Sequence, residues 1–558
     1  MILVDNASTD ETGSLVRRTD GATTVRCEKN LGFLEASNAG SRLARGTYLL
    51  LLNSDTELLP GTLAAAVEVL TADARVGAVG ARLILPDGSL QEAGSIIWRD
   101  GSCLGYGRGE NPDAPPFAFT RDVDFCSAAF LLTRRSVFAQ LGGFDTIYSP
   151  AYYEDADYCA RLWEAGYRVR YDPRVTVRHY EFASSESTDH AISQQRTRRA
   201  VFVSRHRQWL LRRRDFAPRG AVDARVHDTE RRRILVFDDR VPHTVLGSGF
   251  PRAVELVRTL VTLGWEVTFY PLWIVNEPWD EVYNELPRTV EVMTGLGPSH
   301  VKTFLNERAG FYRIVLVSRS HNLDRLRATL GPPESWCPGT PMVYDAEAVQ
   351  APREAMRRRI EGVEVAADDV DNAISRELSE VAKMDAVITV SQLEKELLSR
   401  AGRPVHIITH MVRPRPGSSS FADRSGFLFV GAFSEQSPNT DSILWFCAAV
   451  LPRLRERLGS IDLTIGGHAP PPEVAALAGE GIRVLADVSD LSPLYERVRA
   501  VIAPTRFAAG IPLKVIHEQH ARREREAHDD REKVEQIPGV QRHRKEARRP
   551  PGKDQERN

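Results

Sequence analysis

The sequence contains few cysteines, and their spacing does not suggest a covalent or metal-bound framework. Only six of the 558 residues are cysteine, and none forms a Cys-x-x-Cys pair. Zinc-stabilised and disulfide-stabilised small domains are therefore not indicated, and a reducing cytoplasm is the expected location. The sequence also lacks any run of about 18 apolar residues, so no membrane-spanning helix is expected.

An excess of charge of either sign is also missing. The 73 lysines and arginines nearly balance the 75 acidic residues, for a formal net charge of −2. The whole-chain charge therefore gives no reason to expect a nucleic acid as partner. The length exceeds what one hydrophobic core usually supports, so two or three domains are expected.

The first two stretches of the chain differ sharply in pattern. Residues 1–181 alternate short apolar strands with helical segments, which is typical of an α/β domain. Residues 182–233 are basic, with 13 arginines against four acids between positions 196 and 233. We predict a basic amphipathic helix followed by a linker. Its charged face would either be solvated or contact an anionic membrane surface peripherally.

Two further α/β stretches and a charged tail follow. Residues 234–413 and 414–516 each contain strand and helix patterns, and they are separated by the Pro-, Gly- and Ser-rich text "PRPGSSSFADR". In residues 517–558, 22 of 42 positions are Asp, Glu, Lys or Arg. Such a segment buries too little apolar surface to offset its ordering entropy, so a disordered tail or a loose helix is expected.

Acidic residues follow two apolar strands of the first stretch. "MILVDN" places Asp5 at the end of a strand, where it could accept a hydrogen bond from a nucleobase or a ribose hydroxyl. "LLLLNSDTEL" runs four leucines into Asp55, at the strand end where open α/β sheets bind ligands. That carboxylate could hold Mg²⁺ or Mn²⁺ against a diphosphate. Each aspartate could equally be an ordinary turn residue.

A third acidic group lies in "YYEDADYCARLWEAGY". Glu154 and Asp155 could supply a general base that deprotonates an acceptor hydroxyl, with Asp157 close by. The same residues could simply cap a helix and compensate its dipole. His179, at the end of a later strand, could add a metal ligand or be an ordinary surface histidine.

Taken together, these motifs resemble the family 2 glycosyltransferases of GT-A fold, especially rhamnosyltransferase-like members that build bacterial surface polysaccharides. The matching stretches are "VDNASTD", "NLGF", "LLNSDT", "GGFD" and "YEDADYCARLWEAGY", within roughly residues 1–215. The family pattern begins with a strand and helix before "VDN" that this sequence does not contain. We therefore expect a Rossmann-like mixed sheet without its first strand.

The resemblance implies an inverting transfer from a nucleoside-diphosphate sugar to a glycan or lipid-linked acceptor. Asp5, Asn30 and Asn53 would bind the nucleotide sugar. Asp55, which ends the DXD-like triplet Asn-Ser-Asp, would ligate a divalent metal together with His179. Asp155 would act as the base, and Glu154 would help to bind the acceptor.

The second half resembles the family 4 (group 1) glycosyltransferases of GT-B fold, which have two Rossmann-like lobes. Gly247 and Gly249 flank Ser248 before a helix, and this loop is either a diphosphate cradle or a tight turn. Lys514 matches a phosphate-contacting position, although a lone lysine is often only solvent-exposed. The family pattern breaks off after Ile516, so the carboxyl lobe is expected to be incomplete, with a frameshift as the simplest cause.

The overall hypothesis is a two-unit glycosyltransferase with a metal cofactor in its first unit. One alternative is a catalytically impaired transferase that serves as a binding or scaffold module. A nicotinamide-dependent oxidoreductase is a weaker alternative, because the loop at residues 247–249 lacks the full dinucleotide fingerprint.

Overall fold

The computed structural model describes most of the chain, namely residues 1–180, 188–217, 220–228, 232–247, 249–411, 419–433, 437–488 and 490–507. These residues form two compact units. The first comprises Met1–Thr244 with Gly249–Thr409, and the second comprises the described residues of Val245–Ser248 and His410–Asn558. Lys514 and the predicted charged tail, residues 517–558, lie outside the described residues.

The N-terminal part of the first unit, residues 1–228, is built on a mixed seven-stranded sheet. Strand β10 is antiparallel to β3 and β5, whereas β11 is parallel to β5. Leu49 and Leu51 are buried because alternate side chains of a strand point to the same face. The sheet order is β3 (Tyr48–Leu52), β10 (Phe130–Arg134), β5 (Val76–Ile84), β11 (Arg168–His179) and β4 (Thr56–Leu58), with β6 (Leu90–Ala93) on β5 and β9 (Arg121–Asp122) on β11.

Helices cover this sheet with their apolar faces. In α3 (Thr62–Ala72), Ala65, Ala66, Val69 and Leu70 are buried against strand residues that include Val79 and Val177. Their spacing of three and four positions places them on one side of the helix. The other elements of this part are α4 (Arg135–Gln140), α5 (Glu154–Glu164), the hairpin β7 (Ser95–Ile97) with β8 (Cys103–Gly105), and the 3₁₀ turns η1 (Pro115–Phe117) and η2 (Thr146–Tyr148).

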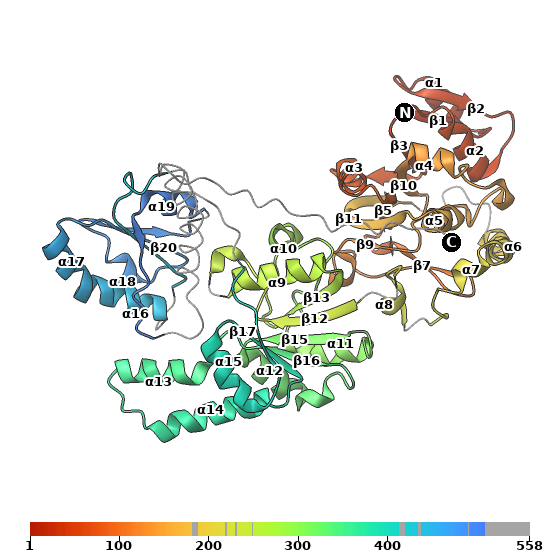
Figure 1. Cartoon of the computed structure of the whole chain (residues 1–558). Coiled ribbons are helices and arrows are strands. Elements are labelled where there is room, and N and C mark those ends of the chain that lie inside the picture. Colours follow the sequence, from red (N-terminus) through yellow and green to blue (C-terminus); the bar gives the residue numbers. More distant parts are fainter. Residues whose placement is uncertain are drawn as a thin grey trace, which may run out of the picture. The chain divides into compact units, whose positions relative to one another are not determined.

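The first two strands stand apart from the large sheet. β1 (Ile2–Asp5) and β2 (Thr23–Arg26) form a parallel two-stranded sheet of their own. Figure 1 shows them in red with α1 (Thr12–Arg17) and α2 (Gly32–Ser41) at the N-terminal end of the ribbon. Among the described residues, β1 pairs only with β2 and β3 pairs only with β10. Contacts other than strand pairing therefore attach this small sheet to the rest.

Helix α2 provides that attachment. The Asn38 amide Nδ2 donates to the carbonyl of Phe144 at 2.7 Å, and its Oδ1 accepts from the Phe144 amide at 3.0 Å. Gly32, with φ of +76°, lies so close to Pro150 that a Cβ would stand 2.5 Å from the proline carbonyl oxygen. Only glycine readily adopts this positive φ and also fits this close to Pro150. Helix α2 is thus tied to the segment that leads into α5.

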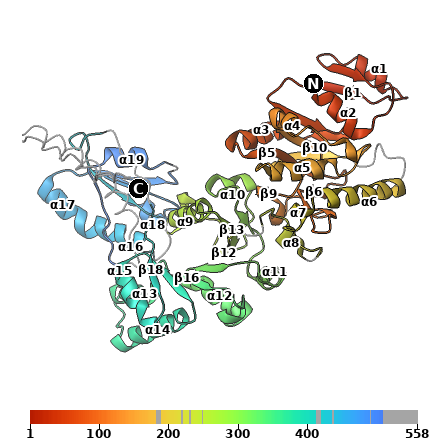
Figure 2. The ribbon, with the colours of Figure 1, turned by 45° about the vertical axis from the view of Figure 1, so that its right-hand side comes forward.

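The arginine-rich stretch packs against the N-terminal part. Phe202 of α6 (Thr188–Arg205) and Trp209 of α7 (Arg207–Leu210) are buried in its core, as is Ala224 of α8 (Ala221–Ala224). Figure 2 shows these three helices beside the strands of this part. Arg213 bonds Asp124 at 2.7 Å, with both side chains buried. Several arginines of the stretch are therefore held by carboxylates of the fold.

The middle part of the first unit, residues 232–244 and 249–409, contains a parallel seven-stranded sheet. Its order, in which β12 lies between β13 and β15, reverses direction along the chain as in doubly wound α/β folds. The strands, in sheet order, are β14 (Glu291–Val292), β13 (Trp265–Pro271), β12 (Arg232–Asp238), β15 (Ile314–Ser318), β16 (Met342–Asp345), β17 (Ala386–Thr389) and β18 (Val405–Ile407). The helices are α9 (Phe250–Thr262), α10 (Trp279–Glu285), α11 (Val301–Glu307), α12 (Ser320–Leu330), α13 (Gln350–Ile360), α14 (Ala367–Val381) and α15 (Gln392–Leu398).

The second unit contains a smaller parallel sheet of four strands. Phe429, Ile465 and Ile443 form its core together with Val474. Its sheet order is β21 (Ile482–Ala486), β20 (Leu463–Gly467), β19 (Phe427–Val430) and β22 (Ala500–Val501). Its helices are α16 (Pro438–Trp445), α17 (Leu451–Leu458), α18 (Pro472–Ala475) and α19 (Ser492–Arg497).

The α/β class predicted from the strand and helix alternation is confirmed by these sheets. Within the described part of the chain, every helix falls short of the length or the hydrophobicity needed to cross a membrane.

Candidate active site

Asp5 lies at the end of β1, as predicted, and is buried. Its Oδ1 accepts from the Ser8 amide at 2.9 Å, and its Oδ2 forms an ion pair with Arg26. The hydrogen bond from the Ser8 amide lowers the pKa of the Asp5 carboxyl, and Arg26 acts in the same direction. Asp5 is therefore an anion at neutral pH, and its hydrogen bond with the Ser8 amide also stabilises the loop after β1.

Asn30 belongs to the next loop and supports it from within. Its Oδ1 accepts from Asn6 Nδ2 at 2.8 Å and from the Gly32 amide at 2.9 Å. These bonds join the loop after β1 to the loop before α2. The predicted role of Asn30 in binding a nucleotide sugar remains a prediction.

Asp55 and His179 are neighbours in the structure. Strand β4 follows Asp55 directly, and its pairing with β11 sets His179 opposite Thr56. His179 Nε2 lies 3.3 Å from Asp55 Oδ1. Residues 124 positions apart in sequence are thus brought within reach of one ion.

The surroundings of His179 suit a metal ligand. Its Nδ1 lies 2.8 Å from Gln91 Oε1, an amide oxygen that can only accept. In the neutral tautomer that donates from Nδ1 to Gln91, the lone pair is on Nε2, which lies 3.3 Å from Asp55 Oδ1 and could bind a metal there. Among the described residues, no group of three or more His, Cys, Asp or Glu is arranged so that it could hold a metal ion. A metal here would have two protein ligands and would take the others from diphosphate and water, as Mg²⁺ commonly does.

Asn53 stands between the strand β3 and Asp55. Its backbone amide donates to the Ala129 carbonyl at 3.1 Å, while its side-chain Oδ1 is buried without a hydrogen-bond partner. Buried acceptors of this kind are uncommon, and a bound hydroxyl would satisfy this one.

Glu154 and Asp155 begin helix α5. Asp155 Oδ2 accepts from the Ala128 amide at 3.2 Å and Oδ1 from the Ala156 amide at 2.8 Å. Burial raises the pKa of Asp155, and burial together with the neighbouring Asp155 charge raises the pKa of Glu154 to about 8. At neutral pH Glu154 is therefore mostly protonated, and the two backbone amides that donate to Asp155 favour its carboxylate form.

The backbone just before α5 is strained. Tyr152 and Tyr153 both have positive φ, at 75° and 70°. Each such residue costs about 1–3 kcal/mol and persists only where the surroundings impose it. Glu154 Oε2, which follows them, is buried without a hydrogen-bond partner. The fold thus holds an unsatisfied acidic group in place at this point.

Asp157, the last acid of "EDAD", has a structural role instead. It is fully buried and bonds Arg161 Nε at 2.7 Å and His206 Nε2 at 2.8 Å. Burial acts to raise its pKa, but the hydrogen bond and charge of His206 and Arg161 outweigh burial and lower it. It anchors α6 and α7 to α5.

Two stretches of the chain match known sequence families. Residues 1–142 match the family described as "Glycosyl transferase family 2", and residues 424–523 match "Glycosyl transferases group 1". Two separate stretches of the chain therefore match glycosyltransferase families. The first match covers Asp5, Asn30, Asn53 and Asp55 and ends before α5. The resemblance of both halves to glycosyltransferases is confirmed.

Individual relatives point the same way. The N-acetylglucosaminyl-diphospho-decaprenol L-rhamnosyltransferase of Mycobacterium tuberculosis is 29% identical over 254 residues, which cover 41% of this chain and 82% of the relative. The O-antigen biosynthesis protein RfbC of Myxococcus xanthus is 30% identical over 33% of this chain and 15% of its own length. An uncharacterised protein of Sinorhizobium fredii is 28% identical over 39% of this chain, which spans only 24% of that protein.

The glycines predicted as a diphosphate cradle in the second glycosyltransferase region fall in different units. Gly249 belongs to the first unit, where the Glu347 carboxylate lies so close that a Cβ would stand 2.0 Å from Oε1. Gly247 belongs to the second, with φ of +62° and Ala432 nearby. Their role remains a prediction, as does that of Lys514, which the structure does not describe.

Glu92 is a site residue that the sequence analysis missed. It is buried on β6, where Oε1 accepts from the Ser127 amide at 3.1 Å and Oε2 from Ser95 Oγ at 2.7 Å. Ser127 directly precedes Ala128, whose amide holds Asp155. Its one sequence signal was a pair of polar residues, Gln91 and Glu92, inside a short strand.

We expect Glu92→Gln to weaken the pH dependence of stability. Burial raises the pKa of Glu92 from 4.5 to about 7, so the folded state binds a proton that the unfolded state has released between these pH values. Wild-type stability therefore falls as pH rises from about 4.5 to 7, by roughly 3 kcal/mol from this group. Urea unfolding of both proteins across this range measures the difference.

A matched control for this experiment is Glu68→Gln, which changes an exposed glutamate of the same part. Equal pH dependence in wild type and Glu92→Gln would contradict the raised pKa.

Proposed function

We propose that the N-terminal part transfers a sugar from a nucleoside-diphosphate sugar to a glycan or lipid-linked acceptor, with inversion at the anomeric carbon. The observation that carries this proposal is the short segment 127–129. The Ala128 amide holds the Asp155 carboxylate, and the Ala129 carbonyl receives the Asn53 amide at the end of β3. A candidate base and the strand end that leads to Asp55 therefore meet at adjacent residues.

Each reacting group then has a defined task. The acceptor hydroxyl oxygen attacks the anomeric carbon while the bond from that carbon to the diphosphate oxygen breaks. The hydroxyl proton moves to Asp155, and the nucleoside diphosphate leaves with the bonding electron pair. Glu154, protonated at neutral pH, can donate a hydrogen bond to the acceptor. A divalent metal held by Asp55 and His179 would neutralise charge on the leaving diphosphate.

The named relatives support a rhamnose donor and a surface-polysaccharide product. One is an L-rhamnosyltransferase that acts on N-acetylglucosaminyl-diphospho-decaprenol, and another is an O-antigen biosynthesis protein. We therefore propose a lipid-linked sugar as the acceptor, at the cytoplasmic face of the cell membrane.

The test is a transfer assay with the full chain, Mn²⁺ and either UDP- or dTDP-linked sugars, including dTDP-L-rhamnose. N-acetylglucosaminyl-diphospho-polyprenol is the acceptor, and mass spectrometry detects the product. We expect a product heavier by one deoxyhexose with the rhamnose donor. Absence of any sugar transfer with every donor, by protein shown to be folded, would contradict the proposal.

A further inference from the structure

A cavity of about 560 Å³ lies within the first unit, between the N-terminal part and the middle part. One wall comes from residues of β9 and β11, and the other from β12, β13 and β14. A backbone hydrogen bond from Thr120 to Arg288 at 2.8 Å, and the buried ion pair of Arg225 with Glu291 at 2.7 Å, join the walls. This volume is within the range of small-molecule sites.

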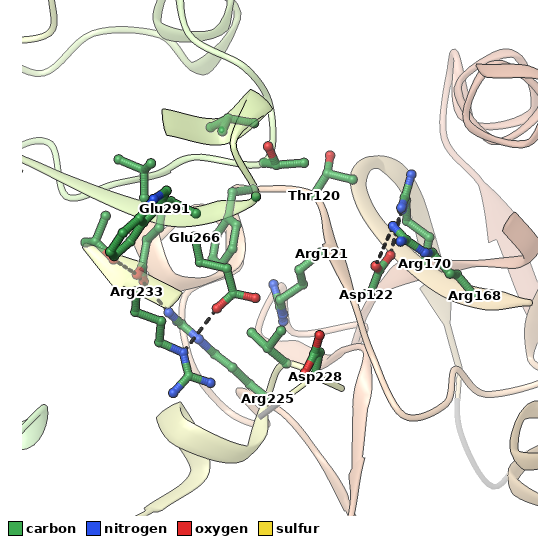
Figure 3. Close-up of a pocket in the computed structure, with 18 of the residues that line it drawn as sticks. Thr120, Arg121, Asp122, Arg168, Arg170, Arg225, Asp228, Arg233, Glu266 and Glu291 are labelled. Atoms are coloured by element: carbon green, nitrogen blue, oxygen red, sulfur yellow. Dashed lines mark hydrogen bonds and ion pairs between the residues drawn. The ribbon is translucent and has the colours of Figure 1, made fainter. Parts of the chain in front are cut away.

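Positive charge predominates in the cavity wall. Six arginines and four acidic residues line it. Three of the acids are held by arginine: Asp122 bonds Arg170 at 2.8 Å, Glu266 bonds Arg233 at 3.1 Å, and Glu291 bonds Arg225. Figure 3 shows Arg121, Arg225, Arg233 and Arg170 gathered around the space with these partners.

Arg121 has no carboxylate partner among the contacts of the described residues. It is 4% exposed, and its Nη2 donates to the carbonyl of Ala93, while Nε and Nη1 are buried without a hydrogen-bond partner. Its guanidinium lies over the ring of Tyr171 at 4.5 Å. Burial lowers its pKa to about 10, so it remains a cation at neutral pH.

Two neighbouring arginines have unused donors as well. Nε of Arg225 and Nη2 of Arg233 are buried without partners, and these side chains are 3% and 4% exposed. Leaving several charged donors unsatisfied in a buried wall is costly. The cost falls if an anion accepts hydrogen bonds from them.

We propose that this cavity binds a small phosphate-bearing anion, at a site separate from Asp55 and Asp155. Guanidinium N–H groups donate strong hydrogen bonds to phosphate oxygens, and the three arginines with partnerless nitrogens, Arg121, Arg225 and Arg233, all line this cavity. A diphosphate, with several oxygens and more than one negative charge, fits the excess of positive charge better than a single carboxylate does. The site joins the N-terminal and middle parts, so its ligand stabilises their contact.

The experiment is calorimetric titration of the full chain with inorganic pyrophosphate, in EDTA so that metal-dependent binding at Asp55 is suppressed. We expect saturable binding that Arg121→Gln weakens at least tenfold. Glu266→Gln, which removes a negative charge from the wall, should strengthen binding about threefold or more. Arg357→Gln, on the surface of α13 and outside the cavity, should leave it unchanged.

Three results would overturn the proposal: no saturable binding by folded wild type, equal affinity in Arg121→Gln and Glu266→Gln, or loss of binding in Asp55→Ala. The last would place the pyrophosphate at the donor site instead. If Arg121→Gln fails to fold by circular dichroism, the direction of the Glu266→Gln effect decides the question. Because no sugar transfer is measured, failure here is distinct from failure of the proposed function.

Discussion

We expect Asp155→Asn to lower kcat of the proposed sugar transfer by about 10²–10⁴-fold, with little change in donor binding. Asparagine keeps the size of the side chain and can still accept from the Ala128 amide, but it cannot take the acceptor proton. Initial rates are measured at saturating donor, and donor affinity is measured separately by calorimetry. Together they distinguish loss of the general base from loss of donor binding.

A control for this variant lies on the same helix. Glu164→Gln changes a carboxylate at the other end of α5, where the side chain is 45% exposed, and should leave kcat near that of wild type. Transfer by Asp155→Asn at the wild-type rate would rule out Asp155 as the base. Equal glycan output in cells that carry either form would favour a non-catalytic binding or scaffold role.

We expect Asp55→Ala to weaken the metal-dependent binding of the donor nucleotide by about 100-fold or more. The variant removes the carboxylate that lies 3.3 Å from His179 Nε2, which is one of the two proposed protein ligands. Gln91→Ala should cause a smaller loss, of about tenfold, because Gln91 contacts the His179 ring and is not itself a proposed metal ligand.

Calorimetric titration of the full chain with UDP and dTDP, with and without Mn²⁺, measures these losses. A useful control is Glu57→Gln, which alters an exposed carboxylate two positions away on β4 and should bind as wild type does. Metal-dependent binding that survives in Asp55→Ala would show that the metal, if bound, is held elsewhere.

The strand ends that carry the site could be read from the sequence. Four leucines followed by a polar triplet predicted both β3 and the position of Asp55, because a buried strand must end in residues that reach solvent or ligand. The acids before "CARLWEAGY" predicted the start of α5 for a similar local reason. These features depend on a few consecutive residues.

The roles of Asp157 and of the arginine-rich stretch could not be read in this way. Asp157 looked like a partner of Asp155, but its carboxylate faces His206 and Arg161 in the core. The arginines after position 196 suggested a solvated face or a membrane contact, yet Arg213 and Arg225 form buried ion pairs. Charge in the sequence does not reveal which carboxylate a long side chain will reach.

The sequence by itself determined the α/β class, the strand that delivers Asp55, and the acids at the start of α5. Only the tertiary structure decided that His179 lies beside Asp55 and that Arg121 lines a cavity between two parts of the fold. It also decided that Glu92 and Asp155 accept hydrogen bonds from the adjacent amides of Ser127 and Ala128. The physical reason is the distance along the chain between the residues that interact. Strand and helix patterns follow from neighbouring residues, whereas strand pairing and burial bring together groups far apart along the chain.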